Sequence, residues 1–142
     1  MKVVIPGGSG QVGTLLARAF QGADHEVVVL SRTARTASWP VVTWDASTTG
    51  PWVREIDGAD VVINLAGRSV NCRYTPRNRE AIKHSRVRST QIVGEAIAAA
   101  KRPPRVWLQA STATIYAHRY DAPNDYQTGG FYAGREQHAH AA

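Results

Sequence analysis

A glycine-rich turn near the start of the sequence limits what this chain can fold into more than any other feature. It follows an apolar run at residues 3–6 and reads Gly7-Gly8-Ser9-Gly10-Gln11-Val12-Gly13. Beyond it, apolar residues recur three and four positions apart, which is the spacing of one helix face. They are Val12, Leu15, Leu16, Ala19 and Phe20. The pattern predicts a strand, a tight glycine turn and a helix in immediate succession.

Three of the glycines are spaced GxxGxxG, which indicates a binding site for the diphosphate of a dinucleotide. A diphosphate at a helix N-terminus needs backbone N–H groups with no side chains in the way. Gly7 would make the tight turn, Gly10 would admit the diphosphate, and Gly13 would let the helix pack closely. The alternative is an ordinary glycine-rich turn, but the flanking strand and helix favour the dinucleotide site. The residues expected to bind the cofactor here are Gly7, Ser9, Gly10, Gln11, Val12 and Gly13.

The next apolar run, at residues 26–30, predicts a second buried parallel strand and so completes a right-handed βαβ unit. It ends at Ser31 and Arg32, with no Asp or Glu at this place. An acidic residue here binds the adenosine ribose of NAD, whereas an arginine suits the 2′-phosphate of NADP. The two side chains therefore favour NADP(H) over NAD(H). The alternative is that Arg32 is an ordinary surface arginine.

The rest of the chain alternates apolar runs with helical patterns. Runs at residues 41–44, 60–67 and 105–110 predict three more strands. Residues 51–56 predict a short helix with Pro51 in its first turn. A long helix is expected to begin at the cap Thr75. Its inward-facing positions are Ile82, Ser85, Arg86, Ser89, Ile92, Val93, Ala96, Ile97 and Ala100.

The ends of the third and fourth predicted strands supply further candidate residues. Asp45 follows the third strand, where it could accept a hydrogen bond from the adenine amino group or equally cap the next turn. Leu65, Ala66 and Gly67 end the fourth strand. Open α/β sheets bind ligands beyond the carboxyl ends of their strands, and the small residues leave room there for a nicotinamide ribose.

Composition and charge bear on the partners of this chain. Its 142 residues suffice for one domain with a hydrophobic core, and no apolar run is long enough to cross a bilayer. The net charge of +6 points toward nucleic acid, but the basic residues are spread along helix faces and loops, so we expect no such partner. Because Met1 directly precedes the first strand and Cys72 is the only cysteine, we expect a cytoplasmic protein without a cleaved leader. The sequence does not decide between a monomer and a homodimer.

Neither metal nor thiol chemistry is expected. His138 and His140 stand in a polar segment without nearby carboxylates, which does not match a metal-ligand pattern. Cys72 lies in a polar loop with no histidine close in sequence, so we do not expect it to act as a nucleophile. Residues 118–142 carry no regular period and predict an irregular or disordered tail.

Four segments together resemble the short-chain dehydrogenase/reductase superfamily, in its extended or atypical branch. They are the glycine turn, Ser31-Arg32, Asn64-Leu65-Ala66-Gly67 and residues 110–116. Within the branch, residues 64–86 are most similar to the sugar-nucleotide-epimerase-like proteins of the NAD-dependent epimerase/dehydratase family. The resemblance covers residues 1 to about 125. It implies NADP(H), or NAD(H), as the cofactor and adds Arg73 to the residues expected to bind it.

The predicted elements and this resemblance together imply one fold. We expect an α/β protein, an NAD(P)-binding Rossmann-like three-layer sandwich with a parallel sheet in the order 3-2-1-4-5. Residues 1–117 would form this domain, with the tail of residues 118–142 outside it.

The same resemblance implies an active site made of a Ser or Thr, a Tyr and a Lys. The match at the strand end puts the first at Thr112, with Ser111 as the alternative, to bind the substrate oxygen. The tyrosine would move a proton on that oxygen and the lysine would lower its pKa. The two should be spaced Tyr-x-x-x-Lys on the next helix, but no tyrosine here has a lysine four residues later. Members of the epimerase-like group also depart from this pattern.

Two functions remain in competition. The first is the NAD(P)-binding domain of an epimerase/dehydratase-like short-chain oxidoreductase, preferring NADP(H) and catalytically incomplete as this chain. We expect a truncated or naturally abbreviated form, because the resembling proteins continue to a sixth and seventh strand and a substrate-binding part. The alternative is a non-catalytic NADP-binding sensor or protein-interaction module. The residues that would select a small-molecule substrate are missing, so the substrate is unknown.

Overall fold

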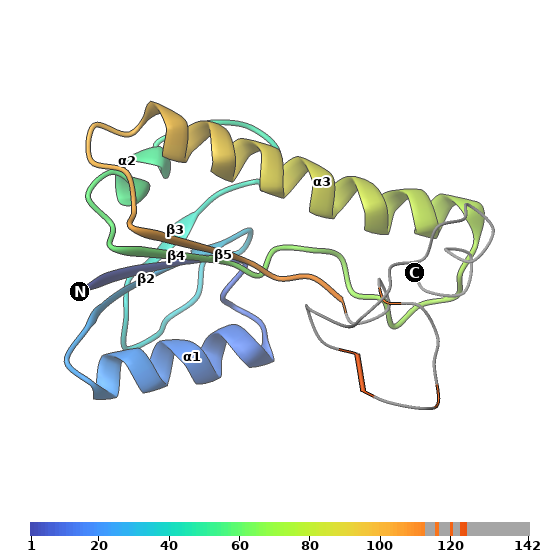
Figure 1. Cartoon of the computed structure of the whole chain (residues 1–142), viewed down its shortest axis with the longest axis horizontal. Coiled ribbons are helices and arrows are strands. Elements are labelled where there is room, and N and C mark those ends of the chain that lie inside the picture. The colour runs from blue at the N-terminus through green and yellow to red at the C-terminus, as the bar shows by residue number, and fades with distance from the viewer. Residues whose placement is uncertain (113–115, 117–119, 121–122, 125–142) are drawn as a thin grey trace.

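The computed structural model describes residues 1–112, 116, 120 and 123–124, and these form a parallel sheet between helices (Figure 1). The sheet has five strands in the order β3-β2-β1-β4-β5. The predicted three-layer α/β sandwich and its strand order are therefore confirmed. In chain order the elements are β1 (Lys2–Pro6), α1 (Gln11–Gly22), β2 (Glu26–Ser31), β3 (Val41–Thr43), α2 (Val53–Ile56), β4 (Val61–Asn64), α3 (Pro76–Ala99) and β5 (Val106–Gln109).

Strand β1 is the centre of the sheet and sets its register. It pairs along its whole length with β2, and Val3 and Val4 pair with Val61 and Val62 of β4. All of these pairings are parallel. The carboxyl ends of β1, β2 and β4 therefore meet at one edge of the sheet, and the loops that follow them lie together there.

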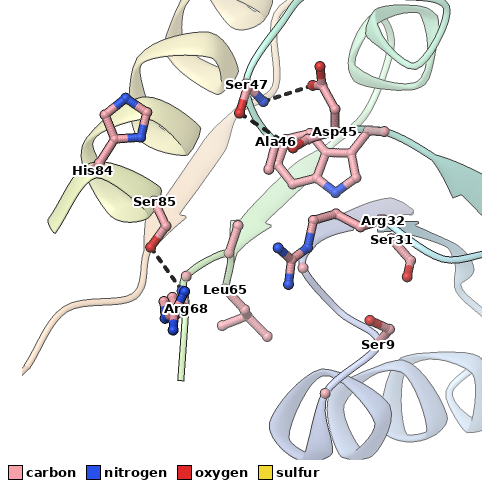
Figure 2. A pocket seen from close by; sticks show the side chains of 15 residues that line it. Ser9, Ser31, Arg32, Asp45, Ala46, Ser47, Leu65, Arg68, His84 and Ser85 are labelled. Atoms are coloured by element: carbon pink, nitrogen blue, oxygen red, sulfur yellow. Dashed lines mark hydrogen bonds between the residues drawn. The ribbon is translucent and has the colours of Figure 1, made fainter. Parts of the chain in front are cut away.

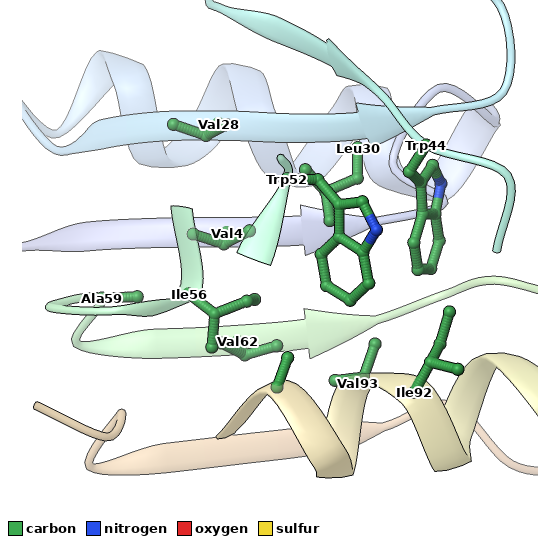
Figure 3. Packing of buried hydrophobic residues seen from close by; sticks show 11 residues of the cluster. Val4, Val28, Leu30, Trp44, Trp52, Ile56, Ala59, Val62, Ile92 and Val93 are labelled. Carbon is green, nitrogen blue, oxygen red and sulfur yellow. The ribbon is translucent and has the colours of Figure 1, made fainter. Parts of the chain in front are cut away.

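Side chains of the strands alternate between two hydrophobic cores, one on each face of the sheet. Helix α1 covers one face, and α2 and α3 cover the other (Figure 1). The core under α1 contains Val3, Ile5, Ala17, Val27, Val29 and Ile63. The core under α2 and α3 is centred on Val4, Leu30 and Val62 and includes Trp44 and Trp52 (Figure 3). The ring centroids of the two tryptophans lie 5.2 Å apart in an edge-to-face arrangement.

The face of α1 that packs on the sheet differs from the one predicted by apolar spacing. Gly13 and Ala17 are buried, whereas Val12 and Leu15 of the predicted face are more exposed than buried. The cause is the close approach at the turn, because a Cβ at Gly13 would overlap backbone atoms of Gly8. Only the helix side with the smallest residues fits against the turn. Of the predicted face, the residues that pack partly against the sheet are Leu16 and Phe20.

Helix α3 follows its prediction closely. The Thr75 hydroxyl accepts a hydrogen bond from the backbone N–H of Asn78 at 3.2 Å, and Pro76 opens the helix. Its buried residues are Ile82, Ser89, Ile92, Val93 and Ala96, all on the predicted inward face. None of the helices among the described residues has the length and apolar character that a membrane span requires.

Element boundaries differ from the predictions by a few residues. Strand β3 ends at Thr43, one residue earlier than predicted, although the N–H of Trp44 still donates to the carbonyl of Ser31 at 3.1 Å. Helix α2 begins only at Val53, and Pro51 lies in the turn before it. Strand β4 ends at Asn64, so Leu65 to Gly67 form a loop beyond the sheet edge.

Strand β5 is the edge of the sheet and is exposed along its whole length. Its large apolar residues Val106, Trp107 and Leu108 are 40–51% exposed. The Trp107 ring lies against Gly94 of α3, and Leu108 pairs with Ile63, whose side chain belongs to the core on the α1 side. In parallel strands directly paired residues point to the same face, so Leu108 also faces the α1 side.

Candidate functional site

A pocket of about 290 Å³ opens at the sheet edge where the carboxyl ends of β1, β2 and β4 meet (Figure 2). Its walls come from the glycine turn, the end of β2, the loop after β3, the loop after β4 and one turn of α3. It brings together most of the residues that sequence reasoning assigned to a cofactor. The predicted residues that line it are Gly7, Ser9, Gly10, Ser31, Arg32, Asp45, Leu65, Ala66 and Gly67.

Two glycines of the turn have separate structural roles. Gly7 has a φ of +74°, and a Cβ there would lie 2.6 Å from Cα of Ala66, so a side chain is excluded by both conformation and space. Its N–H donates to the carbonyl of Leu30 at 2.9 Å. Gly10 is the N-cap of α1, and a Cβ there would meet no atom within 4 Å. Gly7 therefore joins the turn to β2 and lets it approach the loop after β4, while Gly10 leaves open space in the pocket.

The N-terminus of α1 is suited to an anion. Gly10 provides no side-chain cap, and the first turn of the helix contains no acidic residue. The first backbone N–H groups of a helix have no partner within the helix, and its dipole puts partial positive charge there. Gly10 at this terminus lines the pocket, so an anionic group there would lie near the positive end of the helix.

Ser31 and Arg32 border the pocket at the end of β2. Ser31 is 3% exposed, and its hydroxyl accepts a hydrogen bond from the N–H of Thr33 at 3.2 Å. Arg32 is exposed, and Figure 2 shows its guanidinium extending into the pocket from the Ser31 side. This places a cation at the strand end where an acidic residue would select an unphosphorylated ribose.

The side chain of Asp45 caps the turn after β3. One carboxylate oxygen accepts the backbone N–H groups of Ser47 and Thr48, both at 2.8 Å, and the other accepts the Thr48 hydroxyl at 2.6 Å. The Thr48 hydroxyl, followed by these backbone bonds, lowers the pKa of Asp45 to about 2. Of the two roles left open by the sequence, the structure contains the cap. A contact with adenine stays a prediction, since a carboxylate has further acceptor positions and Asp45 also lines the pocket.

The loop after β4 is held by a buried amide that sequence reasoning did not single out. Asn64 is fully buried; its Oδ1 accepts the N–H of Ala66 at 3.0 Å, and its Nδ2 donates to Oε1 of Gln109 at 2.9 Å. On the other side, the hydroxyl of Ser89 donates to the carbonyl of Ala66 at 3.4 Å. Asn64 thus ties the pocket loop to β5, and α3 steadies it from behind.

Comparison with known proteins decides the family. The model of the NAD dependent epimerase/dehydratase family matches residues 3–141. The chain belongs to this family. The predicted resemblance to this family is therefore confirmed.

Three relatives of this chain are longer proteins that it matches over part of their length. An epimerase family protein of Staphylococcus saprophyticus is 34% identical over 113 residues, which are 80% of this chain and 38% of that protein. The structure of a human epimerase family protein with NADPH superposes with a TM-score of 0.76 at 29% identity, covering 92% of this chain and 43% of that one. A nucleoside-diphosphate sugar epimerase from Corynebacterium glutamicum superposes with a TM-score of 0.68 at 31% identity, covering 86% and 25%. The chain spans less than half of each.

The epimerase-family pocket also contains residues that the sequence did not reveal. The backbone N–H of Arg68 donates to the hydroxyl of Ser85 at 2.9 Å, which joins the loop after β4 to α3 (Figure 2). His84 of α3 also lines the pocket. No local spacing links these segments; the inward position of Ser85 on the helix pattern was the only signal available. The further pocket residues missed from sequence are Trp44, Ala46 and Ser47.

Other predicted residues do not line this pocket. The side chain of Val12 is 61% exposed, and Gly13 is buried beneath the turn. Gln11, at the start of α1, and Arg73, in the loop before α3, stand outside the lining. The candidate substrate-binding residues, Ser111 and Thr112, follow β5 and are exposed. Their roles stay predictions.

Some predictions fall wholly or mostly on residues outside the described part. His138 and His140 lie outside it, as does most of the expected tail at residues 118–142. Among the described residues, no group of three His, Cys, Asp or Glu side chains converges as a metal site would require.

Proposed function

We propose that residues 1–117 are the cofactor-binding domain of an epimerase/dehydratase-like short-chain oxidoreductase, and that this domain prefers NADP(H). The observation that carries the proposal is the pocket at the open N-terminus of α1, bordered at the end of β2 by Ser31 and Arg32. Membership of an NAD-dependent family and likeness to a human relative crystallised with NADPH support it.

In the proposed binding mode each part of the cofactor meets a group of suitable chemistry. The diphosphate lies over Gly10, where the α1 donors are open. The adenosine ribose lies near Ser31, and Arg32 donates to the 2′-phosphate. The nicotinamide ribose lies beyond Ala66 and Gly67, whose side chains take little space.

The chemical step is proposed to be incomplete in this chain. A bound nicotinamide supplies hydride transfer, and the substrate oxygen must exchange a proton in the same reaction. Thr112, or Ser111 beside it, would orient that oxygen. The sequence holds no Tyr-x-x-x-Lys pair to move the proton. We therefore expect cofactor binding without measurable turnover.

Calorimetric titration of the purified chain with NADPH and with NADH tests the cofactor preference. We expect NADPH to bind more tightly, and Arg32→Ala to remove most of the difference. A charge-assisted hydrogen bond contributes about 1.5–3 kcal/mol, which corresponds to a roughly 10- to 150-fold change in affinity. Arg54→Ala is the matched control, because the Arg54 side chain is 74% exposed and does not line the pocket. Equal dissociation constants for the two cofactors would refute the preference.

Turnover distinguishes an incomplete enzyme from a complete one. NADPH oxidation is followed over a panel of carbonyl compounds, and epimer exchange of nucleotide sugars is followed by NMR. General acid–base catalysis contributes about 10²–10⁴ in rate, so its loss should leave activity at background. Turnover that disappears in Thr112→Val would contradict the proposal and would identify Thr112 as part of a working site.

The absent Tyr–Lys pair also favours a second function for this chain, a non-catalytic NADP-binding sensor or protein-interaction module. Binding without turnover is common to both functions, so the gene sequence downstream of the last codon separates them. A continuation in another frame that encodes a substrate domain would favour a truncated enzyme. The cytoplasmic location, the lack of a nucleic-acid partner and the oligomeric state stay predictions from the sequence.

A further inference from the structure

The outer face of helix α1 is apolar, although it points away from the sheet. Val12 and Leu15 are 61% and 60% exposed, and Ala19 and Gly22, farther along the helix, are exposed as well. At 3.6 residues per turn, these four positions lie within about 40° of the direction opposite the buried Ala17. Their spacing of three, four and three residues is that of the seam through which two helices pack. We call these four residues the outer stripe.

A helix on a protein surface normally directs charged and polar side chains outward. In α1 the only charged residue, Arg18, lies on a flank of the helix, where it lines a small pocket with Val41 and residues 35–39. Gln21, on the same flank, exchanges two hydrogen bonds of 2.8 Å with Ser38. The outer stripe itself bears no charge, and Figure 1 shows α1 as the outermost of the described elements on its side of the sheet. An exposed apolar face of this kind indicates a contact surface.

Side-chain size within the outer stripe changes along the helix. Its two large residues, Val12 and Leu15, lie in the first half of α1, and its two smallest, Ala19 and Gly22, lie in the second half. A Cβ at Gly22 would meet no atom within 4 Å, so there is open space at this end. In an antiparallel pair of α1 helices with a twofold axis at the level of Ala17, position 12 lies opposite 22 and position 15 opposite 19. Each large residue then meets a small one, so the outer stripe is complementary to itself.

The distribution of charge also favours a second copy of the chain on this stripe. Residues 68–88 contain six arginines, one lysine and one glutamate, so this segment alone holds a net charge of +6, as much as the whole chain. Most of it belongs to α3, which covers the opposite face of the sheet from α1 (Figure 1). Two copies that meet through their α1 helices therefore keep their basic segments apart, with the sheets between them.

We propose that the outer stripe is the contact surface of a homodimer, in which the α1 helices of two copies pack antiparallel about Ala17. The dimer requires no ligand, so the proposal goes beyond the dinucleotide function and does not rest on it. With 12 residues, α1 is about 18 Å long, and two such helices bury less surface than a permanent dimer needs. We therefore expect a reversible dimer with a dissociation constant of about 10–100 µM.

Sedimentation velocity of the full chain under reducing conditions, from about 2 to 500 µM, brackets that constant and tests the proposal. Leu15→Glu should raise the dissociation constant at least about tenfold, because two carboxylates would be buried without partners. Val87→Glu is the matched control, since it adds the same charge at a 48% exposed position of α3, and it should leave the constant unchanged.

A second variant separates specific packing from general stickiness. Ala19→Leu adds apolar surface, yet it should also raise the dissociation constant, because Leu15 of the partner subunit fills that space in the antiparallel pair. Circular dichroism and urea denaturation establish that each variant is folded before its association is compared with that of the wild type.

Each contrary result has a distinct meaning. A chain that stays monomeric over the whole concentration range refutes the proposal; if this monomer also loses stability in Leu15→Glu, the outer stripe is covered from within the chain. A dimer that Leu15→Glu leaves intact uses another surface, which refutes it as well. Tighter association in Ala19→Leu shows unspecific apolar contact and refutes the antiparallel pairing, and assembly beyond a dimer contradicts a closed twofold contact. None of these results depends on cofactor binding, so each leaves the proposed function standing.

Discussion

The chain contains two strand–helix–strand units whose helix entrances are built in opposite ways. In the first unit, β1–α1–β2, the helix begins at Gly10 without any side-chain cap, and the pocket opens directly in front of it. In the second unit, β4–α3–β5, the helix begins at Thr75, whose hydroxyl accepts the N–H of Asn78. A capped terminus has already satisfied a donor that an anion would need. The same supersecondary unit thus has an uncapped turn that opens on a pocket in one place and a capped turn in the other.

The strands that end the two units differ as much as their helix entrances. Leu30 of β2 is fully buried, whereas Leu108 of β5 is 51% exposed. Strand β2 has a neighbour on each side, while β5 pairs only with β4 among the described residues. Similar apolar strand sequences therefore make unequal contributions to stability, because burial depends on what lies alongside and above them.

The largest expected effect comes from a pair of helix glycines, one in each unit. A Cβ at Gly13 would overlap backbone atoms of Gly8, while a Cβ at Gly94 would only approach the Trp107 ring at 3.3 Å. We expect Gly13→Ala to lower the free energy of unfolding by about 3 kcal/mol or more. Gly94→Ala should be neutral or raise it by up to about 1 kcal/mol, because alanine favours the helix. Urea denaturation measures both, and equal effects would remove the contrast between the two units.

The next effect compares the two leucines directly. Leu30→Ala should cost about 2–5 kcal/mol, as truncation of a fully buried leucine does. Leu108→Ala should change the free energy of unfolding by less than about 0.5 kcal/mol, because its side chain is half exposed. Both values come from the same denaturation experiment. A large cost for Leu108→Ala would mean that β5 is covered in solution.

A third comparison separates binding from stability at the two helix entrances. Gly10→Val places a branched side chain where the diphosphate is proposed to lie, yet its Cβ meets no atom of the chain within 4 Å. We expect the variant to fold and to lose more than about 100-fold in NADPH affinity, or about 2.7 kcal/mol. Thr75→Ala should show the reverse, costing about 1 kcal/mol of stability through the lost cap and leaving NADPH affinity unchanged. Retained affinity in folded Gly10→Val would show that the turn serves packing alone.

The smallest effect concerns the turn that leads from the first unit to the second. Because the Thr48 hydroxyl and two backbone N–H groups hold the pKa of Asp45 at about 2 in the folded chain, the ionised carboxylate stabilises the fold. That contribution is present above pH 4 and is lost as the pH falls toward 2. Asp45→Asn should be less stable than the wild type at pH 6, with the difference shrinking toward pH 2. The measurement is urea denaturation at several pH values, and a difference independent of pH would contradict it.

The local elements of this protein were determined by its sequence alone. The glycine turn, the cap at Thr75 and the inward face of α3 were all predicted, and the structure has them in place. These features depend on backbone conformation and on hydrogen bonds within a few residues, so their signals are local. The strand order followed from short right-handed connections together with the family resemblance.

Tertiary structure decided which faces are buried and which residues share the pocket. Apolar spacing put Val12 and Leu15 against the sheet, but the close contact between Gly13 and Gly8 turned the small-residue side inward. The hydrogen bond between Asn64 and Gln109 joins residues 45 positions apart in the sequence. Local sequence patterns do not indicate contacts between residues so far apart. The sequence left a cap and an adenine contact equally open for Asp45; the structure contains the cap, and the adenine contact stays a prediction. The spacing of apolar residues indicates the secondary structure that one segment prefers. Which side chains are buried and which residues line a pocket depend on the distant segments that pack together.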